Sequence, residues 1–166
     1  MTPIAPLVLM AAALGAGCAA SSPVRVDVPF HEQEEGHCGE AALAMLLDHA
    51  GKPADPALLR RRLYLPALNG TVTDLMVEVA RDQGVPARKL KSPDRAAAEH
   101  AMAAPMAALL GPFHQGRVGH FVVVTGFQIG RWVDVHSGRS RDLRLEWSKF
   151  MDRWAESEYE GMVILP

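Results

Sequence analysis

Apolar residues recur three or four positions apart through the first two thirds of the chain, which is the spacing of amphipathic helices. Asp55 precedes Pro56, and this pair is typical of an N-cap followed by proline in the first helical turn. A later run ends at Gly84, and its N-cap is expected at Thr71 or Thr73. The pattern predicts helices at residues 38–50, 55–63, 71–84 and 93–103.

From residue 105 onward the pattern changes to short β-like runs separated by glycine-bearing turns. The sequence predicts strands at 105–111, 120–127, 131–138, 141–147 and 161–166, and two earlier ones at 24–30 and 85–90. One helix is expected among the late strands, at 148–155, where Phe150 and Trp154 lie four apart on one face. Helices followed by strands indicate an α+β domain whose two halves are segregated along the chain.

The first 18 residues carry no charged side chain, and their apolar run, residues 4–16, is too short to span a bilayer. A short apolar core followed by small residues is typical of a secretory signal. Because a cysteine follows, the segment resembles a bacterial lipoprotein signal, in which Cys18 becomes the lipidated first residue. We expect a signal at 1–18, a linker at 19–25 and one domain at 26–166, exported and anchored to the membrane facing the periplasm. Ordinary secretion and a cytosolic N-terminal helix are the alternatives.

The length of the chain bears on the number of domains, and its net charge bears on the kind of partner. A chain of 166 residues is long enough for one domain with its own core. The formal net charge of −2 gives no reason to expect a nucleic acid as the partner.

The cysteine count limits the roles of the second cysteine. If Cys18 is lipidated or removed, Cys38 has no intramolecular disulfide partner. A lone thiol in an exported protein is then a buried structural residue, a nucleophile or a metal ligand. A zinc site would draw on His31, His37 and His120, but adjacent His37 and Cys38 suit one metal poorly. We therefore expect no metal and no cofactor.

Cys38 has the surroundings of a nucleophile. It lies between Gly36 and Gly39 where a loop meets a helix N-terminus, whose positive end is expected to lower the pKa of the thiol. Gln33 lies five residues upstream, and its amide together with the backbone N–H of the nucleophile would supply two donors to an oxyanion. His120 opens the most strongly β-forming run in the chain, so a rigid strand would hold its imidazole. The residues thus favour acyl transfer through a thiol.

Two blocks of sequence resemble a known family. The stretches "QEEGHCGEAALAMLLDHAG" and "GHFVVVTGF", with "LYLPALNGT" and the final "GMVILP", are similar to a papain-like cysteine peptidase of the bacteriocin-leader-processing, or double-glycine, type. The resemblance runs from about residue 28 to the C-terminus. It implies a papain-like fold, with the nucleophile at a helix N-terminus in the first half and the histidine on an antiparallel sheet in the second.

The resemblance also implies roles for single residues. Cys38 would be the nucleophile, His120 the general base and acid, and Gln33 part of the oxyanion hole, acting on a peptide or protein substrate. The family usually has an Asp, followed by Pro, at the end of the second hairpin strand. Here His136-Ser137 occupies that place, and Asp134 is the nearest carboxylate. We expect His136 or Asp134 to orient His120; the alternative is that neither contacts the ring and a backbone carbonyl or water orients it.

Two other functions stay open at this point. One is a catalytically inactive lipoprotein of the same fold that binds peptides. The other is a transamidase, which would transfer the acyl group to an amine instead of water.

Overall fold

The computed structural model describes residues 21–111 and 119–166. The expected signal with Cys18 lies outside these residues. The helices are α1 (Cys38–His49), α2 (Pro56–Leu63), α3 (Thr73–Asp82), α4 (Arg95–Ala101) and α5 (Trp147–Ala155), with a 3-10 turn η1 (Pro66–Leu68). The strands are β1 (Val24–Arg25), β2 (Ala87–Leu90), β3 (Met106–Leu110), β4 (His120–Gln128), β5 (Trp132–Ser137), β6 (Ser140–Glu146) and β7 (Gly161–Ile164).

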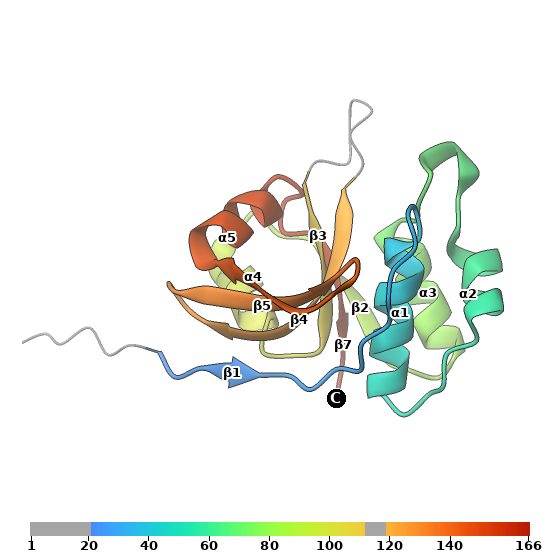
Figure 1. The fold of residues 1–166 in the computed structure, drawn as a ribbon, viewed down its shortest axis with the longest axis horizontal. Coiled ribbons are helices and arrows are strands. Elements are labelled where there is room, and N and C mark those ends of the chain that lie inside the picture. The colour runs from blue at the N-terminus through green and yellow to red at the C-terminus, as the bar shows by residue number, and fades with distance from the viewer. Residues whose placement is uncertain (1–20, 112–118) are drawn as a thin grey trace, which may run out of the picture.

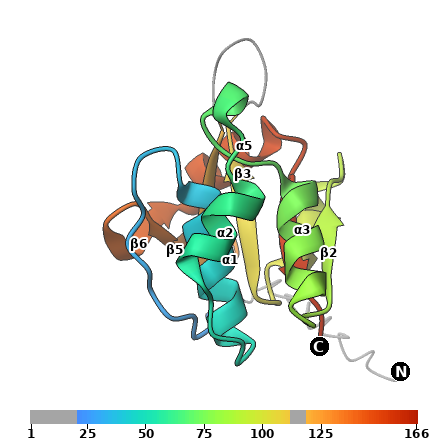
Figure 2. The ribbon, with the colours of Figure 1, turned by 90° about the vertical axis from the view of Figure 1, so that its right-hand side faces the viewer.

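One antiparallel sheet organises the domain. Its strands follow the order β2-β7-β3-β4-β5-β6, and β1 pairs with the second half of β4 (Figure 1). Helices α1, α2 and α3 gather on one side of the sheet, while α4 and α5 lie on the other (Figure 1, Figure 2). The expected α+β class, with helices first and an antiparallel sheet later, is confirmed.

Each face of β4 belongs to a different apolar core. Phe121 and Val123 join the core that α1, α2 and α3 cover, whereas Val122 and Val124 join the core under α4 and α5. Because side chains alternate between the two faces of a strand, a strand covered on both faces is apolar throughout. This burial explains the unbroken β-forming run after His120, and it fixes the strand that carries this histidine.

The ends of α1 and α2 follow from local sequence. Gly36 has a φ of +76°, a left-handed conformation that lets the loop turn sharply into α1 two residues later. Asp55 caps α2 by accepting hydrogen bonds from the N–H groups of Ala57 and Leu58, at 2.9 and 3.2 Å. The cap expected at Asp55 is therefore confirmed.

Two local expectations are wrong. α3 is preceded by Val72, which makes no side-chain cap, and the Thr73 hydroxyl donates instead to Glu160 at 2.7 Å. The strand expected at 24–30 is limited to Val24–Arg25, which lies within the segment assigned to a linker and pairs with β4. Within 21–111 and 119–166, none of the helices has both the length and the apolar character needed to cross a membrane.

Candidate active site

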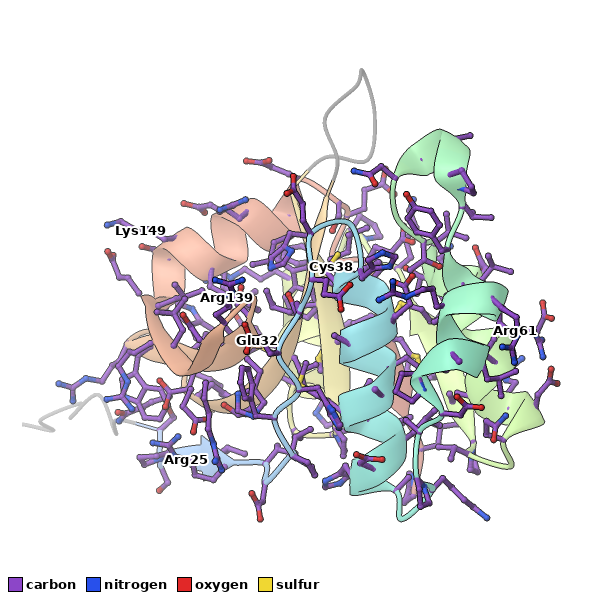
Figure 3. All side chains as sticks on the ribbon, turned by 45° about the vertical axis from the view of Figure 1, so that its right-hand side comes forward. Arg25, Glu32, Cys38, Arg61, Arg139 and Lys149 are labelled. Carbon is purple, nitrogen blue, oxygen red and sulfur yellow. The ribbon has the colours of Figure 1, made fainter. Side chains whose placement is uncertain are left out.

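Cys38 is the first residue of α1, at the point where the loop carrying Glu32 reaches the helix (Figure 3). Its side chain is half-buried beside the start of β4, and the backbone N–H of Phe121 donates to the sulfur. Burial raises the pKa of the Cys38 thiol, and the negative charge of Glu40 raises it further. The N–H groups of Phe121, Gly39 and Cys38 itself act in the opposite direction. Burial outweighs these donors, so the expectation of a lowered thiol pKa is wrong and the thiol is protonated at rest.

His120 begins β4 and pairs with Leu110 of β3. Its Nε2 lies 2.9 Å from the hydroxyl oxygen of Ser137, the last residue of β5. Burial lowers the pKa of the His120 imidazole, and the positive charge of Arg153 lowers it further. The imidazole is therefore neutral at rest and free to accept a proton.

Gln33 is held by one turn of the sheet. The turn glycine Gly138 donates its N–H to Gln33 Oε1 at 2.8 Å, and its carbonyl accepts the Gln33 N–H at 3.0 Å. Gln33 is only 8% exposed, and its Nε2 has no hydrogen-bond partner among the described residues. Because the Gly138 N–H already donates to the Gln33 amide oxygen, the NH₂ group is the part of this amide that remains for another hydrogen bond. An unpaired buried donor costs free energy that an incoming acceptor would restore.

These three residues line one cleft of about 370 Å³. Its walls come from the loop before α1, the start of β4, the turn after β5 and the loop after η1. The lining residues are Gln33, Glu34, Glu35, Gly36, Cys38, Asn69, Gly119, His120 and Gly138. The structure thus brings together the three residues that the sequence favours, although they lie up to 87 positions apart.

His136 and Asp134 are engaged elsewhere, which corrects the expectation that one of them orients His120. The His136 ring is buried; Nε2 lies 3.0 Å from the Val28 carbonyl oxygen, and the ring accepts the Asp142 N–H at Nδ1. Asp134 is buried, and its carboxylate accepts a bidentate hydrogen bond from Arg144 at 2.8 and 2.9 Å. Arg25 lies 2.7 Å from it as well. Both residues hold the strands of the sheet together.

The histidines near the cysteine also have partners of their own. His31 Nε2 lies 2.6 Å from an Asp48 carboxylate oxygen, and His37 Nδ1 lies 2.9 Å from a Glu40 oxygen. In the part of the chain that the structure describes, no three His, Cys, Asp or Glu side chains come together as metal ligands.

The sequence places Ser137 beside His136 at the position of the family's Asp-Pro pair, but it is Ser137, and not His136 or Asp134, that contacts the imidazole. The contact between Ser137 and His120 follows from the strand register. His136 pairs with Val123, on the face opposite to that of Val122. Extending this pairing by one residue places Ser137 opposite Val122, on the face that His120 shares.

Comparison with known proteins identifies the family. Residues 28–164 match the peptidase C39 family. A search of curated proteins found no match.

Several solved structures share the fold. The chain is similar to a double glycine motif protease from an AMS/PCAT transporter, crystallised in complex with the leader peptide: 22% identity, TM-score 0.69, covering 87% of this chain and 97% of that one. It is similar to the peptidase domain of Streptococcus ComA, a bi-functional ABC transporter: 21% identity, TM-score 0.65, covering 84% and 97%. A C39-like peptidase from Bacillus anthracis aligns at 15% identity with a TM-score of 0.71, covering 87% and 98%.

The structural likeness extends over nearly the whole of each relative, and the family match spans the helices, the cleft and the sheet. The chain therefore belongs to the peptidase C39 family and is a cysteine peptidase with a papain-like α+β fold.

Proposed function

We propose that Cys38 is the nucleophile of this peptidase, with His120 as general base and acid and Gln33 in the oxyanion hole. The observation that carries this proposal is the cleft itself. It joins a thiol at a helix N-terminus, a neutral imidazole on a fixed strand, and a buried amide whose NH₂ group has no partner among the described residues. Acyl transfer through a thiol uses all three groups.

The first half of the reaction forms an acyl-enzyme. His120 takes the proton of the Cys38 thiol, and the thiolate sulfur bonds to the carbonyl carbon of the substrate, whose oxygen becomes an oxyanion. The NH₂ group of Gln33 and the backbone N–H of Cys38 donate to that oxygen. As a first-turn amide, the Cys38 N–H has no acceptor within its own helix. The His120 imidazolium then protonates the leaving amine, the C–N bond breaks and a thioester remains.

The second half releases the product. His120 removes a proton from water, the resulting hydroxide bonds to the thioester carbonyl, and the C–S bond breaks. The proton on His120 returns to the sulfur, so the enzyme regains its neutral thiol and neutral imidazole. Burial of both groups favours this neutral resting pair, as the directions of their pKa shifts require.

Alkylation by iodoacetamide tests the pair without any substrate. In the wild-type protein the rate should begin to rise at a pH below that of an isolated thiol in this site, because His120 accepts the proton. In His120→Ala the proton acceptor is gone while burial still raises the pKa of the thiol, so the rise should move to higher pH. Cys38→Ala should abolish labelling within the domain. If the two profiles of wild type and His120→Ala coincide, the proposed pair is wrong, and a fold that only binds peptides is the remaining interpretation.

We further propose that the substrate is a peptide, cleaved with water as the acyl acceptor. The solved relative bound to a leader peptide supports a peptide in this cleft. Mass spectrometry of the products in the presence of a primary amine distinguishes water from amine as the acceptor. An amide product containing the added amine would identify a transamidase instead.

We also propose that residues 1–18 form a signal and that Cys18 carries the lipid of a periplasm-facing lipoprotein. The support is the uncharged apolar run followed by small residues and a cysteine. A mature N-terminus at Cys18 with the added mass of acyl chains would establish this proposal. Recovery of Cys18→Ser in the same membrane fraction as the wild type would contradict it.

A further inference from the structure

The imidazole of His120 has a neutral hydroxyl beside it, in the place where His136 or Asp134 was expected. Its Nε2 and the Ser137 Oγ are 2.9 Å apart, a normal hydrogen-bond length, and both side chains are partly buried. Ser137 ends β5, immediately before Gly138, whose positive φ of 59° makes the turn to β6. The contact therefore joins the last position of one rigid strand to the first position of its neighbour.

The direction of this hydrogen bond suits catalysis in both protonation states. A neutral imidazole that accepts the thiol proton at Nδ1 carries its own hydrogen on Nε2, and this N–H donates to Ser137 Oγ. After proton transfer the ring is an imidazolium, and the Nε2–H still donates to the same oxygen. A hydroxyl has lone pairs for this contact throughout the reaction, so the ring need not turn between steps.

The same turn supports the oxyanion donor. Gly138, next to Ser137, holds both the backbone and the side-chain amide of Gln33. Two adjacent residues of one turn thus fix the base and the proposed oxyanion donor relative to each other. His136, the residue before them, anchors the same strand through Val28 and Asp142.

A positive charge acts on the imidazole. Arg153 on α5 acts on His120 and opposes its protonation, and the Asp134 carboxylate is already neutralised by Arg144 and Arg25. A hydroxyl offers the imidazolium a hydrogen bond, but no compensating negative charge. The imidazolium–thiolate pair is consequently less favoured here than it would be beside a carboxylate.

We propose that Ser137 is the positioning residue of His120, the role that His136 and Asp134 do not fill, and that a hydroxyl in this place leaves the catalytic pair weakly activated. This inference rests on the proposed function of Cys38 and His120. Ser137 acts through the imidazole and has no contact of its own with the substrate in the mechanism.

A series of variants at one position tests the proposal, with the pH dependence of iodoacetamide alkylation as the readout. Ser137→Ala removes the acceptor, so the alkylation rate near neutral pH should fall roughly tenfold. Ser137→Thr keeps the hydroxyl and should restore the rate. Ser137→Asp supplies a negative charge beside the imidazolium and should raise the rate by roughly tenfold, with the rise of the profile moved to lower pH.

Ser140 provides the matched control, since it pairs with Ser137 across the same turn and is exposed. Ser140→Asp adds the same charge without reaching the ring, so its profile should match that of the wild type. If Ser137→Ala retains the wild-type profile, or if Ser140→Asp reproduces the effect of Ser137→Asp, the positioning role is wrong. If His120→Ala also has no effect, the catalytic pair itself has failed and the inference falls with it. A changed profile in His120→Ala with an unchanged profile in Ser137→Ala overturns the inference alone.

Discussion

Gly39, the residue after the nucleophile, shows how closely α1 packs against the segment before α3 and against β4. A Cβ added at Gly39 would overlap the Cγ2 methyl of Thr71 and would contact the Phe121 ring 3.6 Å away. Alanine is normally preferred over glycine inside a helix by about 1 kcal/mol. Here we expect the reverse, with Gly39→Ala lowering the free energy of unfolding by about 1–3 kcal/mol because of overpacking. Urea unfolding followed by circular dichroism measures this change.

Thr71→Ser gives the control for Gly39→Ala. It deletes the obstructing methyl and keeps the buried hydroxyl, so the double variant should recover most of the lost stability. A Gly39→Ala protein as stable as the wild type would show that Thr71 can move aside at no cost, contrary to this packing argument.

Gln33 is expected to affect bond cleavage far more than thiol reactivity. Gln33→Ala removes the NH₂ donor that lies unpartnered in the described part of the cleft. Loss of one oxyanion donor typically lowers kcat by about 10²–10³. Alkylation forms no oxyanion, so its rate should fall much less than kcat/KM for any peptide that the wild type cleaves. Equal losses in the two assays would assign Gln33 to the support of Cys38 instead.

At the residue scale, the sequence predicts which residues carry the chemistry, but it does not predict which side chain contacts His120. Cys38, Gln33 and His120 carry local signals, namely a helix start, flanking glycines and a β-forming run. The partner of His120 depends on which face of β5 meets it. The register shifts between Val124 and Gly126, and a shift of one residue changes the face that side chains share. No single residue signals that shift, so the sequence does not favour Ser137 over His136 or Asp134.

At the scale of elements, Asp134 ties three strands together. Its carboxylate, only 2% exposed, meets Arg144 of β6 and Arg25 of β1. The hydrogen bond from Arg144 lowers the pKa of Asp134, opposed by burial and assisted by the charges of Arg144 and Arg25. A lowered carboxyl pKa contributes stability that is present above the ordinary carboxyl pKa of about 4 and lost as the pH falls through the folded-state pKa.

We therefore expect Asp134→Asn to lower the free energy of unfolding near neutral pH by about 1–3 kcal/mol. The destabilisation should shrink as the pH falls below about 4, because the carboxyl of the unfolded wild type is then protonated, and it should vanish once the pH lies below the lowered pKa of the folded state. Urea titrations at several pH values measure both effects. The alkylation profile of Cys38 should stay that of the wild type, and a shifted profile would restore Asp134 as a partner of His120.

Element boundaries followed the sequence where the cause was local. Asp55 with Pro56 fixed the start of α2, and Gly84 follows the end of α3 with a left-handed φ of 77°. The start of α3 did not follow its threonines, because Glu160 near β7 takes the Thr73 hydroxyl. Thr73 and Glu160 are 87 positions apart, so a pattern of neighbouring residues cannot predict their contact.

At the scale of the whole molecule, the separation of helices from strands along the sequence predicts the α+β class. It does not predict how the helices are layered on the sheet. β2 lies among the helices in sequence yet pairs with β7 at the C-terminus, which places it at the end of the sheet. The two apolar cores share β4, whose alternate residues enter each one. Because these pairings join distant segments, they depend on the packing of the complete chain.

The place of β1 in the sheet bears on how the proposed lipid anchor would orient the domain. Cys18 precedes β1 by six residues, a span of at most about 20 Å, so a lipid on Cys18 would keep β1 close to the membrane. β1 pairs with β4 at Gly126 and Phe127, whereas the cleft lies at His120, about 20 Å away along the same strand. β1, to which such a lipid would be tied, and the cleft lie at opposite ends of β4, so the cleft should remain open to solvent on a membrane surface. A bulky, membrane-impermeant maleimide should label Cys38 of the lipidated protein on vesicles as fast as it labels soluble Cys18→Ser. Slower labelling on vesicles, abolished by detergent, would place the cleft against the lipid and contradict this arrangement.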